Sequence, residues 1–322
     1  MQYRNLGSTD LRISEIGFGA WGIGGSMWLG ASDAKSLRAL HAAADLGLNL
    51  IDTALAYGDG HSERLVGRFL RERKEKVQVA TKIPPMNGLW PARKGTTLKE
   101  VFPYDYIIGS TEKSLKNLDA ETIDLLQFHV WMDDWADDDE WKRAFEDLKK
   151  AGKIRYAGIS INDHQPANAL RAAASGCCDA FQVIYNIFDQ IPENELFPAA
   201  LERKIGIIVR VPFDEGALAG TVTPATEFPK GDFRNNYFRG GRKSDVFRRI
   251  SRLNTFLGPE ASTLPELALR FCLHHPAVST VIPGMRTVHH AEANCRVSDG
   301  RKLSPTVLAG LRKHAWEKNY YA

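Results

Sequence analysis

Cysteine is scarce in this chain of 322 residues, with only four, at positions 177, 178, 272 and 295. None of them forms a C-x-x-C pair, and a chain of this length does not need disulfides to hold a fold. A long apolar run is also absent, and the first ten residues lack the apolar stretch of a signal peptide. We therefore expect a reduced, cytoplasmic protein with no membrane association.

Charge of one sign is not in excess, because 42 Lys and Arg residues face 39 Asp and Glu residues, for a net charge of +3. The basic residues are spread along the chain, whereas a nucleic-acid surface gathers them on one face. No nucleic-acid partner is expected, and nothing in the sequence indicates an oligomer. Hydrophobic residues make up 43% and charged residues 25%, which excludes disorder as the main state.

Short apolar runs alternate with helical patterns along most of the chain. The runs expected as strands are residues 16–19, 48–52, 77–81, 123–129, 154–160, 180–185, 205–211 and 278–282. Their nearly continuous apolar character is typical of strands buried on both faces. Helical patterns lie between them, for example over residues 33–46, 111–118 and 139–150. About eight alternations predict a parallel sheet, and the length favours one (β/α)8 TIM barrel over residues 1–322 rather than an open sheet.

Two long insertions interrupt this rhythm, at residues 84–109 and at residues 214–259. In a barrel they follow the third and seventh strands, on the C-terminal face where active sites are built. The stretch 228–239 is rich in arginine and aromatic residues, and we interpret it either as a lid over a ligand or as a fixed extension.

Two apparent motifs carry little weight. Gly17, Gly19 and Gly22 match G-x-G-x-x-G, but no helix opens there, so a Rossmann site is rejected. The acidic run 133–140 lacks the spacing of a calcium loop and fits the N-terminus of a helix better. No metal site is expected.

Four polar residues stand at or just after successive strand ends: Asp52, Tyr57, Lys82 and His129. In a parallel barrel they meet at one mouth. A lysine ammonium favours the phenolate of a nearby tyrosine, an aspartate holds that lysine charged, and a histidine polarises a carbonyl. Such a set can donate a proton to an oxygen while a hydride arrives at the carbon. Each residue also has a purely structural interpretation, as a turn cap, a loop aromatic, a solvated charge or a core histidine.

Four segments resemble the aldo-keto reductase family. They are LIDTALAYGDGHSERLVG at residues 50–67, VATK at residues 79–82, DLLQFH at residues 124–129, and IPG at residues 282–284 with Asn294. The resemblance implies a (β/α)8 barrel with a short N-terminal β-hairpin over its base and NADP(H) at the C-terminal mouth. It implies that Asp52, Tyr57, Lys82 and His129 are catalytic and that Tyr57 is the proton donor when an aldehyde or ketone is reduced.

The resemblance also implies a set of cofactor contacts. They are Gly19, Ala20, Trp21, Asp52, Ser160, Asn162, Gln182, Tyr185, Val211, Pro212, Phe213, Gly216, Leu218, Ile282, Gly284, Met285, Arg286, His290 and Asn294. Ser160, an asparagine and Gln182 would hold the carboxamide, and Tyr185 would stack on the nicotinamide ring. Arg286 would bind the 2′-phosphate, which favours NADPH.

The chain departs from the family pattern at three of these positions. Ile161 separates Ser160 from Asn162, residues 211–213 read Val-Pro-Phe where the family usually has Ser-Pro-Leu, and His290 stands where glutamine is frequent. All three departures concern the cofactor and none concerns the catalytic set.

The substrate is expected to be a small carbonyl compound in a largely aromatic mouth. Trp21, Tyr57, Trp90, His129 and Trp131 are the expected contacts, and Trp90 and Trp131 have the alternative role of bracing loops.

Two other functions are weighed against this reductase. A cofactor-binding regulatory subunit resembling potassium-channel β subunits keeps the same fold and cofactor. A barrel glycosidase needs two facing carboxylates, for which Asp133 and Asp214 are candidates, but it leaves the Asp-Tyr-Lys-His set unexplained.

Overall fold

The protein is a (β/α)8 barrel, as the sequence predicts. The computed structural model describes residues 1–321. Eight parallel strands follow one another in sequence order around the sheet. They are β3 (Phe18–Gly19), β4 (Leu50–Asp52), β5 (Gln78–Ile83), β6 (Ile123–Phe128), β7 (Ile154–Ser160), β8 (Ala180–Ile184), β9 (Gly206–Arg210) and β10 (Val278–Val281). Bridges between Ile16 and Val281 and between Gly19 and Gly284 join the two edges and close the barrel.

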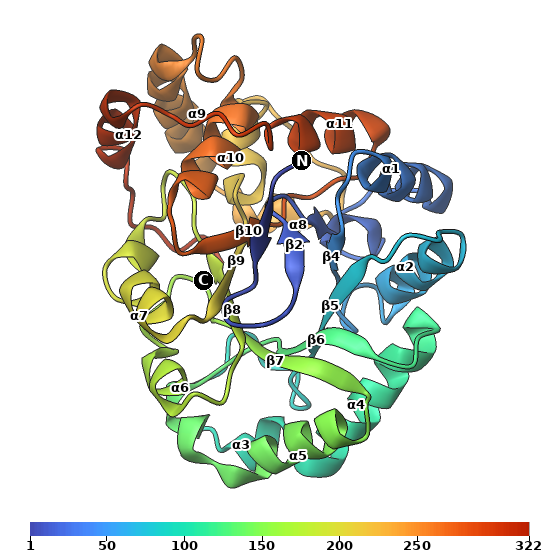
Figure 1. The fold of residues 1–322 in the computed structure, drawn as a ribbon. Helices are drawn as coiled ribbons and strands as arrows, with labels where there is room; N and C mark the ends of the chain where they lie inside the picture. The colour runs from blue at the N-terminus through green and yellow to red at the C-terminus, as the bar shows by residue number, and fades with distance from the viewer. Residues whose placement is uncertain (322) are drawn as a thin grey trace.

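Helices surround the strands on the outside, and Figure 1 shows this ring around the central sheet. The α-helices within residues 1–321 are α1 (Asp33–Asp45), α2 (His61–Arg71), α3 (Leu98–Val101), α4 (Tyr104–Leu118), α5 (Asp139–Lys150), α6 (Leu170–Ser175), α7 (Leu196–Arg203), α8 (Phe233–Tyr237), α9 (Arg242–Leu253), α10 (Leu264–His274), α11 (Val288–Arg296) and α12 (Pro305–Arg312). Of these, α3, α8 and α9 belong to the two insertions and not to the regular alternation of strands and helices. None of the helices within residues 1–321 combines the length and apolar character that crossing a membrane requires.

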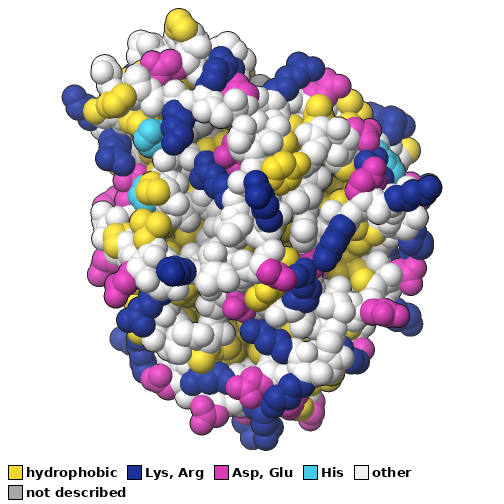
Figure 2. Space-filling view, in the orientation of Figure 1, with side chains coloured by type: hydrophobic (Ala, Val, Ile, Leu, Met, Phe, Trp, Pro, Cys, Tyr) yellow, Lys and Arg dark blue, Asp and Glu magenta, His cyan; other side chains and the backbone are white. Residues whose placement is uncertain are grey.

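An N-terminal hairpin of β1 (Tyr3–Asn5) and β2 (Arg12–Ser14) covers one end of the barrel, where Figure 1 shows it in front of the strands. Leu6, Leu11 and Ile13 of the hairpin are buried in the cluster that fills the barrel interior. The expected hairpin is therefore confirmed, and it closes the base and leaves the opposite, carboxyl end as the mouth. The face drawn in Figure 2 carries Lys and Arg side chains interspersed with Asp and Glu side chains.

Side chains along each strand alternate between the interior and the helix layer, as the period of two requires. The cluster in the barrel interior contains one residue from each of five strands: Leu50, Ala80, Leu125, Ala180 and Ile208. Asp52, Lys82, Gln127, Gln182 and Arg210 follow these at the next inward position of their strands. This alternation decides which polar groups reach the mouth.

The insertions are more ordered than expected. Helix α4 begins at Tyr104, seven residues before the predicted start, so the first insertion ends there instead of at Gly109. It also contains α3, whose N-cap Thr97 and Glu100 form a capping box. The periodicity of residues 104–110 is weak because α4 buries only Ile107 and Ser110 in this first part. The second insertion contains α8 and α9.

Two loops meet over the mouth. The Leu29 backbone N–H donates to the Asp232 carboxylate at 3.2 Å, and the Phe233 N–H donates to the Met27 carbonyl at 2.9 Å. The ring of Phe233 lies 5.2 Å from that of Trp21. The arginine- and aromatic-rich segment 228–239 is thus joined to the loop after β3.

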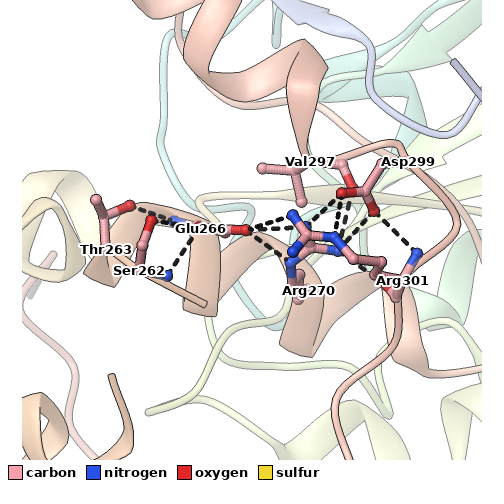
Figure 3. A network of polar contacts seen from close by, with 7 residues as sticks. All are labelled: Ser262, Thr263, Glu266, Arg270, Val297, Asp299 and Arg301. Atoms are coloured by element: carbon pink, nitrogen blue, oxygen red, sulfur yellow. Dashed lines mark hydrogen bonds and ion pairs between the residues drawn. The ribbon is translucent and has the colours of Figure 1, made fainter. Parts of the chain in front are cut away.

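A buried arginine on α10 connects this helix to the segment that follows α11. Arg270 on α10 is 1% exposed at its side chain and pairs at 2.8 Å with both Glu266 and Asp299. Figure 3 shows these carboxylates on either side of the guanidinium, with Arg301 beside Asp299. Arg270 also donates to the Arg301 carbonyl at 2.9 Å, so the segment after α11 is held against α10.

Candidate active site

A buried lysine organises the centre of the mouth. Lys82 on β5 is fully buried, and its ammonium donates to Asp52 Oδ2 at 2.6 Å, to the Thr53 carbonyl at 2.8 Å and to the Tyr57 hydroxyl at 3.3 Å. Burial acts to lower the pKa of Lys82, but the charges of Asp52 and Tyr57 outweigh it and the pKa is raised. The lysine is therefore held as a cation that points at the tyrosine hydroxyl.

Two glutamines complete the surroundings of Asp52. Gln182 donates to Asp52 Oδ1 at 2.7 Å, and Gln127 approaches the same oxygen at 3.3 Å. In this structure the Gln182 amide thus faces Asp52. Gln127 was missed in the sequence, although it lies two residues before His129 and therefore on the same inward side of its strand.

The pKa of Tyr57 departs from the expectation based on its lysine neighbour. Burial raises the pKa of Tyr57, and the nearby Lys82 cation opposes this effect without reversing it. The phenol is therefore protonated at neutral pH, which is the state that a proton donor needs.

His129 lies between two aromatic rings, with its ring centroid 5.5 Å from Tyr57 and 4.5 Å from Trp90. Burial, together with the charges of Lys82 and Arg210, lowers the pKa of His129 well below the usual range. A neutral imidazole therefore stands beside the tyrosine, with Nδ1 buried and without a hydrogen-bond partner. A neutral imidazole can donate one N–H to a carbonyl oxygen without competing for the proton of Tyr57.

The aromatic lining of the mouth is only partly as expected. The ring of Trp21 lies 6.3 Å from Tyr57, and Trp90 is 47% exposed beside His129. Trp131, by contrast, is fully buried, and its ring packs on Phe128 and Trp141 at 5.8 and 5.6 Å. The chain leaves the β6 direction after His129, which carries Trp131 into the helix layer. The structure does not bring Trp131 to the substrate mouth.

Tyr185 is also directed away from the mouth. Its ring packs 4.9 Å from Phe197 and 5.4 Å from Phe271, and its hydroxyl donates to Glu193 at 2.5 Å. The reason is the alternation along β8, where Gln182 and Ile184 face inward, so that Tyr185 faces the helices. The expectation that Tyr185 stacks on a nicotinamide ring is therefore wrong, because its ring lies among the helices. The inward residue at the end of the next strand is Arg210.

Two of the three expected carboxamide contacts are brought together, because Ser160 and Gln182 are register partners on β7 and β8. Asn162 accepts from the Trp131 backbone N–H at 3.2 Å, and its amide approaches the Ala92 carbonyl at 3.4 Å. Ser160 is buried at the end of β7. Of the proposed trio, Ser160 and Gln182 stand on inward positions, whereas Asn162 braces two loops.

The remaining cofactor positions fall into two groups. Exposed or partly exposed positions around the mouth are Gly19, Trp21, Val211, Phe213, Gly216, Gly284, Arg286 and His290. Buried positions are Ala20, Pro212, Leu218, Ile282, Met285 and Asn294. Leu218 and Met285 are fully buried core residues that present no surface to a ligand in this structure.

Arg286 and Arg234 both lie against the ring of Trp28 at one end of the site. The Arg286 guanidinium donates to the Leu29 carbonyl at 2.8 Å and lies 5.6 Å from the ring of Trp28. Arg234 lies 4.5 Å from the same ring. Burial and the charge of Arg234 lower the pKa of Arg286, and Nε1 of Trp28 is buried without a partner. Neither Trp28 nor Arg234 was singled out in the sequence, because they come from two loops that meet only in the fold.

Comparison with known proteins decides the family. The family model described as "Aldo/keto reductase family" matches residues 15–315. The chain belongs to the aldo/keto reductase family. This family consists of oxidoreductases that use nicotinamide cofactors, with relatives that act on aldehydes and ketones.

Individual relatives match this aldo/keto reductase over most of both chains. It is 32% identical to the aldo-keto reductase YhdN of Bacillus subtilis over 298 residues, which cover 91% of this chain and 87% of the relative. It is 30% identical to a probable voltage-gated potassium channel subunit beta of Arabidopsis thaliana over 326 residues, with 96% and 94% covered. The glycerol dehydrogenase AKR11B4 from Gluconobacter oxydans superposes with a TM-score of 0.80 at 29% identity, with 97% and 94% covered.

Proposed function

We propose that this aldo/keto reductase transfers a hydride from NADPH to an aldehyde or ketone and that Tyr57 supplies the proton. The observation that carries the proposal is the Asp52–Lys82–Tyr57 chain of hydrogen bonds, with distances of 2.6 and 3.3 Å, beside a neutral His129. Two of its three members are almost completely buried.

Each residue of this set has a defined task. The Tyr57 hydroxyl donates its proton to the carbonyl oxygen as that oxygen becomes an alkoxide. The Lys82 cation, 3.3 Å from the hydroxyl, stabilises the phenolate that remains. Asp52 keeps the lysine charged and oriented, and His129 donates a hydrogen bond that places the carbonyl oxygen near the phenol. The bound nicotinamide supplies the hydride.

The residues around the mouth fit a nicotinamide cofactor. A Cβ atom at Gly216 or Gly284 would meet nothing within 4 Å, so both glycines border open space. Gly216 has a φ of +98°, a conformation that favours glycine. At the other end, the half-buried Arg286 guanidinium offers donors to an anionic group, which suits the 2′-phosphate of NADPH.

A titration with NADPH and NADH, followed by tryptophan fluorescence, tests this proposal. We expect NADPH to bind at micromolar concentrations and NADH to bind more weakly, and oxidation of NADPH at 340 nm in the presence of small aldehydes. Absence of binding by both cofactors contradicts the proposed enzyme. Tight binding without turnover of any carbonyl compound favours instead a cofactor-binding regulatory subunit, since one relative is named a probable voltage-gated potassium channel subunit beta.

The Arg286→Ala variant tests the cofactor preference. We expect its affinity for NADPH to fall by about tenfold or more, because a charge-assisted hydrogen bond to phosphate is lost. The affinity for NADH, which lacks the 2′-phosphate, should stay within about twofold of the wild type.

The control for this prediction is Arg296→Ala, on the exposed side of α11, where Arg296 pairs only with Glu292 at 3.5 Å among the described contacts. This variant should leave both affinities unchanged. Equal losses for NADPH and NADH in Arg286→Ala would mean that Arg286 does not distinguish the two cofactors.

A further inference from the structure

Gln127 is a fully buried glutamine at the centre of the barrel that has no task in the proton transfer proposed above. It lies on β6 and pairs in register with Lys82 on β5 and with Gly158 on β7. A buried amide needs partners for both its oxygen and its nitrogen, because an unpaired polar atom in the interior is costly. The partners of Gln127 therefore indicate what the side chain is placed to do.

The Gln127 side chain has room because the neighbouring strand carries a glycine. A Cβ atom at Gly158 would lie 3.0 Å from Gln127 Cγ and 3.0 Å from the Ala180 carbonyl oxygen. A side chain at position 158 would therefore displace Gln127. The glutamine is thus seated between β6 and β7, and its amide extends to Asp52 on β4.

The amide of Gln127 contacts two groups that also contact each other. Its Nε2 donates to Asp52 Oδ1 at 3.3 Å, and its Oε1 accepts from Gln182 Nε2 at 3.3 Å. Gln182 Nε2 itself donates to the same Asp52 oxygen at 2.7 Å. The other oxygen of Asp52 accepts from Lys82 at 2.6 Å. Asp52 is therefore held from both sides, by two amides at one oxygen and by the ammonium at the other.

Only one orientation of the two amides satisfies these contacts. If the Gln127 amide were reversed, its oxygen would face the Asp52 carboxylate and its nitrogen would face that of Gln182. The Gln127 oxygen likewise keeps the Gln182 nitrogen directed toward Asp52. All three side chains belong to residues that are at most 2% exposed. Loss of Gln127 would therefore take one donor from a buried carboxylate and leave the other free to turn.

The position of Asp52 matters to Tyr57, because Asp52 is one of the charges around the phenol. Burial raises the pKa of Tyr57, and the Lys82 cation lowers it. The Asp52 charge raises this pKa further, whereas the Arg210 charge lowers it. His129, beside the phenol, is uncharged. Amide donors that take up part of the Asp52 charge therefore weaken its effect on the phenol and favour release of the proton.

We propose that Gln127 is a positioning residue that holds the Asp52 carboxylate against Lys82. Through this pair it acts on the Tyr57 hydroxyl, with which it shares no described hydrogen bond. The proposal rests on the proposed carbonyl reduction with Tyr57 as the proton donor. Gln127 is not among the expected cofactor contacts, so its effect should fall on the rate of reduction and not on the affinity for NADPH.

Gln127→Met tests this role, because it keeps the length of the side chain and removes the amide. We expect the single-turnover rate with NADPH and a saturating small aldehyde to fall by about tenfold, since a hydrogen bond to a charged group is lost. The KM for the aldehyde and the Kd for NADPH should each stay within about threefold. Gln127→Asn, whose amide is one methylene shorter and cannot reach Asp52, should show the same loss and replaces Gln127→Met if that variant does not fold.

A double-mutant cycle separates positioning from a merely structural role. Tyr57→Phe removes the group through which Gln127 is proposed to act. Adding Gln127→Met to Tyr57→Phe should therefore lower the remaining rate by less than about twofold. A structural role would lower the rate by the same factor with and without the phenol.

Gln78→Met is the matched control. Gln78 is also a buried glutamine, two residues before the inward Ala80, but it begins β5 at the far end of the strand from Lys82, and its Oε1 has no partner. This variant should keep the wild-type rate.

Rates within about twofold of the wild type in Gln127→Met and Gln127→Asn overturn the positioning role, as does an equal loss in the Tyr57→Phe background. Neither of these results changes the proposed reduction, which the other two proteins of the cycle test separately. No turnover by the wild type, or full turnover by Tyr57→Phe, overturns the proposed reduction by Tyr57 and the positioning role with it.

Discussion

Tyr57→Phe is expected to lower kcat for carbonyl reduction by about 100- to 10,000-fold, the usual contribution of a positioned proton donor. The phenylalanine ring keeps the packing against His129 and Trp21 but has no proton to give. The affinity for NADPH should remain within about threefold, because the described contacts of the Tyr57 hydroxyl are to Lys82 alone. Single-turnover kinetics with NADPH and a saturating aldehyde measure the loss directly.

Tyr104→Phe is the matched control for this variant. Its hydroxyl also makes a hydrogen bond to a charged side chain, to Asp147 at 2.9 Å, but on the outer helices. It should retain full turnover. Substantial turnover by Tyr57→Phe would exclude the phenol as the proton donor and move that role to His129 or to water.

Arg270→Met is expected to produce the largest loss of stability, about 3–5 kcal/mol in the free energy of unfolding. Removing the guanidinium leaves Glu266 and Asp299 with only the exposed Arg301 as a shared cation, at 3.4 and 2.6 Å, and it removes the hydrogen bond to the Arg301 carbonyl. Urea denaturation followed by fluorescence and by circular dichroism measures the difference from the wild type.

The pH dependence of this difference follows from Asp299. The hydrogen bond from Arg270 holds the pKa of Asp299 far below its usual range. A carboxyl group whose folded pKa is lowered contributes stability above its unfolded pKa, which is about 3.9, and loses it as the pH falls further. The gap between wild type and Arg270→Met should therefore be complete above about pH 5 and shrink below about pH 4.

An exposed ion pair provides the comparison. Arg248 pairs with Asp245 on the surface of α9, with the arginine side chain 74% exposed. Arg248→Met should change stability by less than about 1 kcal/mol at any of these pH values, because exposed pairs contribute little. A similar small effect for Arg270→Met would show that the network is not needed to hold the C-terminal segment.

The sequence alone was sufficient for the barrel and for the meeting of Asp52, Tyr57, Lys82 and His129 at its mouth. Strands buried on both faces and separated by helices have few ways to pack, and the parallel barrel is the one that fits this length. Because parallel strands end on the same side, Asp52, Lys82 and His129 had to approach one another. The motifs at residues 50–67, 79–82 and 124–129 contain these residues in order.

The direction of a side chain at a strand end was harder to predict. Tyr185 directly follows β8 and Arg210 ends β9, and the family resemblance implied Tyr185 as the neighbour of a nicotinamide. The phase of the alternation places Tyr185 among the helices and Arg210 in the mouth. That phase is decided by the pairing of β8 and β9 in the closed sheet, and the outward face of β8 gains apolar contacts that only α7 and α10 provide.

Contacts between distant segments could be decided only by the tertiary structure. Lys318, near the C-terminus, pairs with Asp214 at 2.6 Å, with both side chains almost fully buried, and Tyr321 reaches Glu215. Trp28, Arg234 and Arg286 come together from three parts of the chain. No local pattern marks such pairs, because the partners are far apart in the sequence and meet only when the closed barrel brings their segments together. The sequence by itself thus determined the barrel and the order of the proposed catalytic residues along it, whereas packing across the closed mouth decided which other side chains surround them.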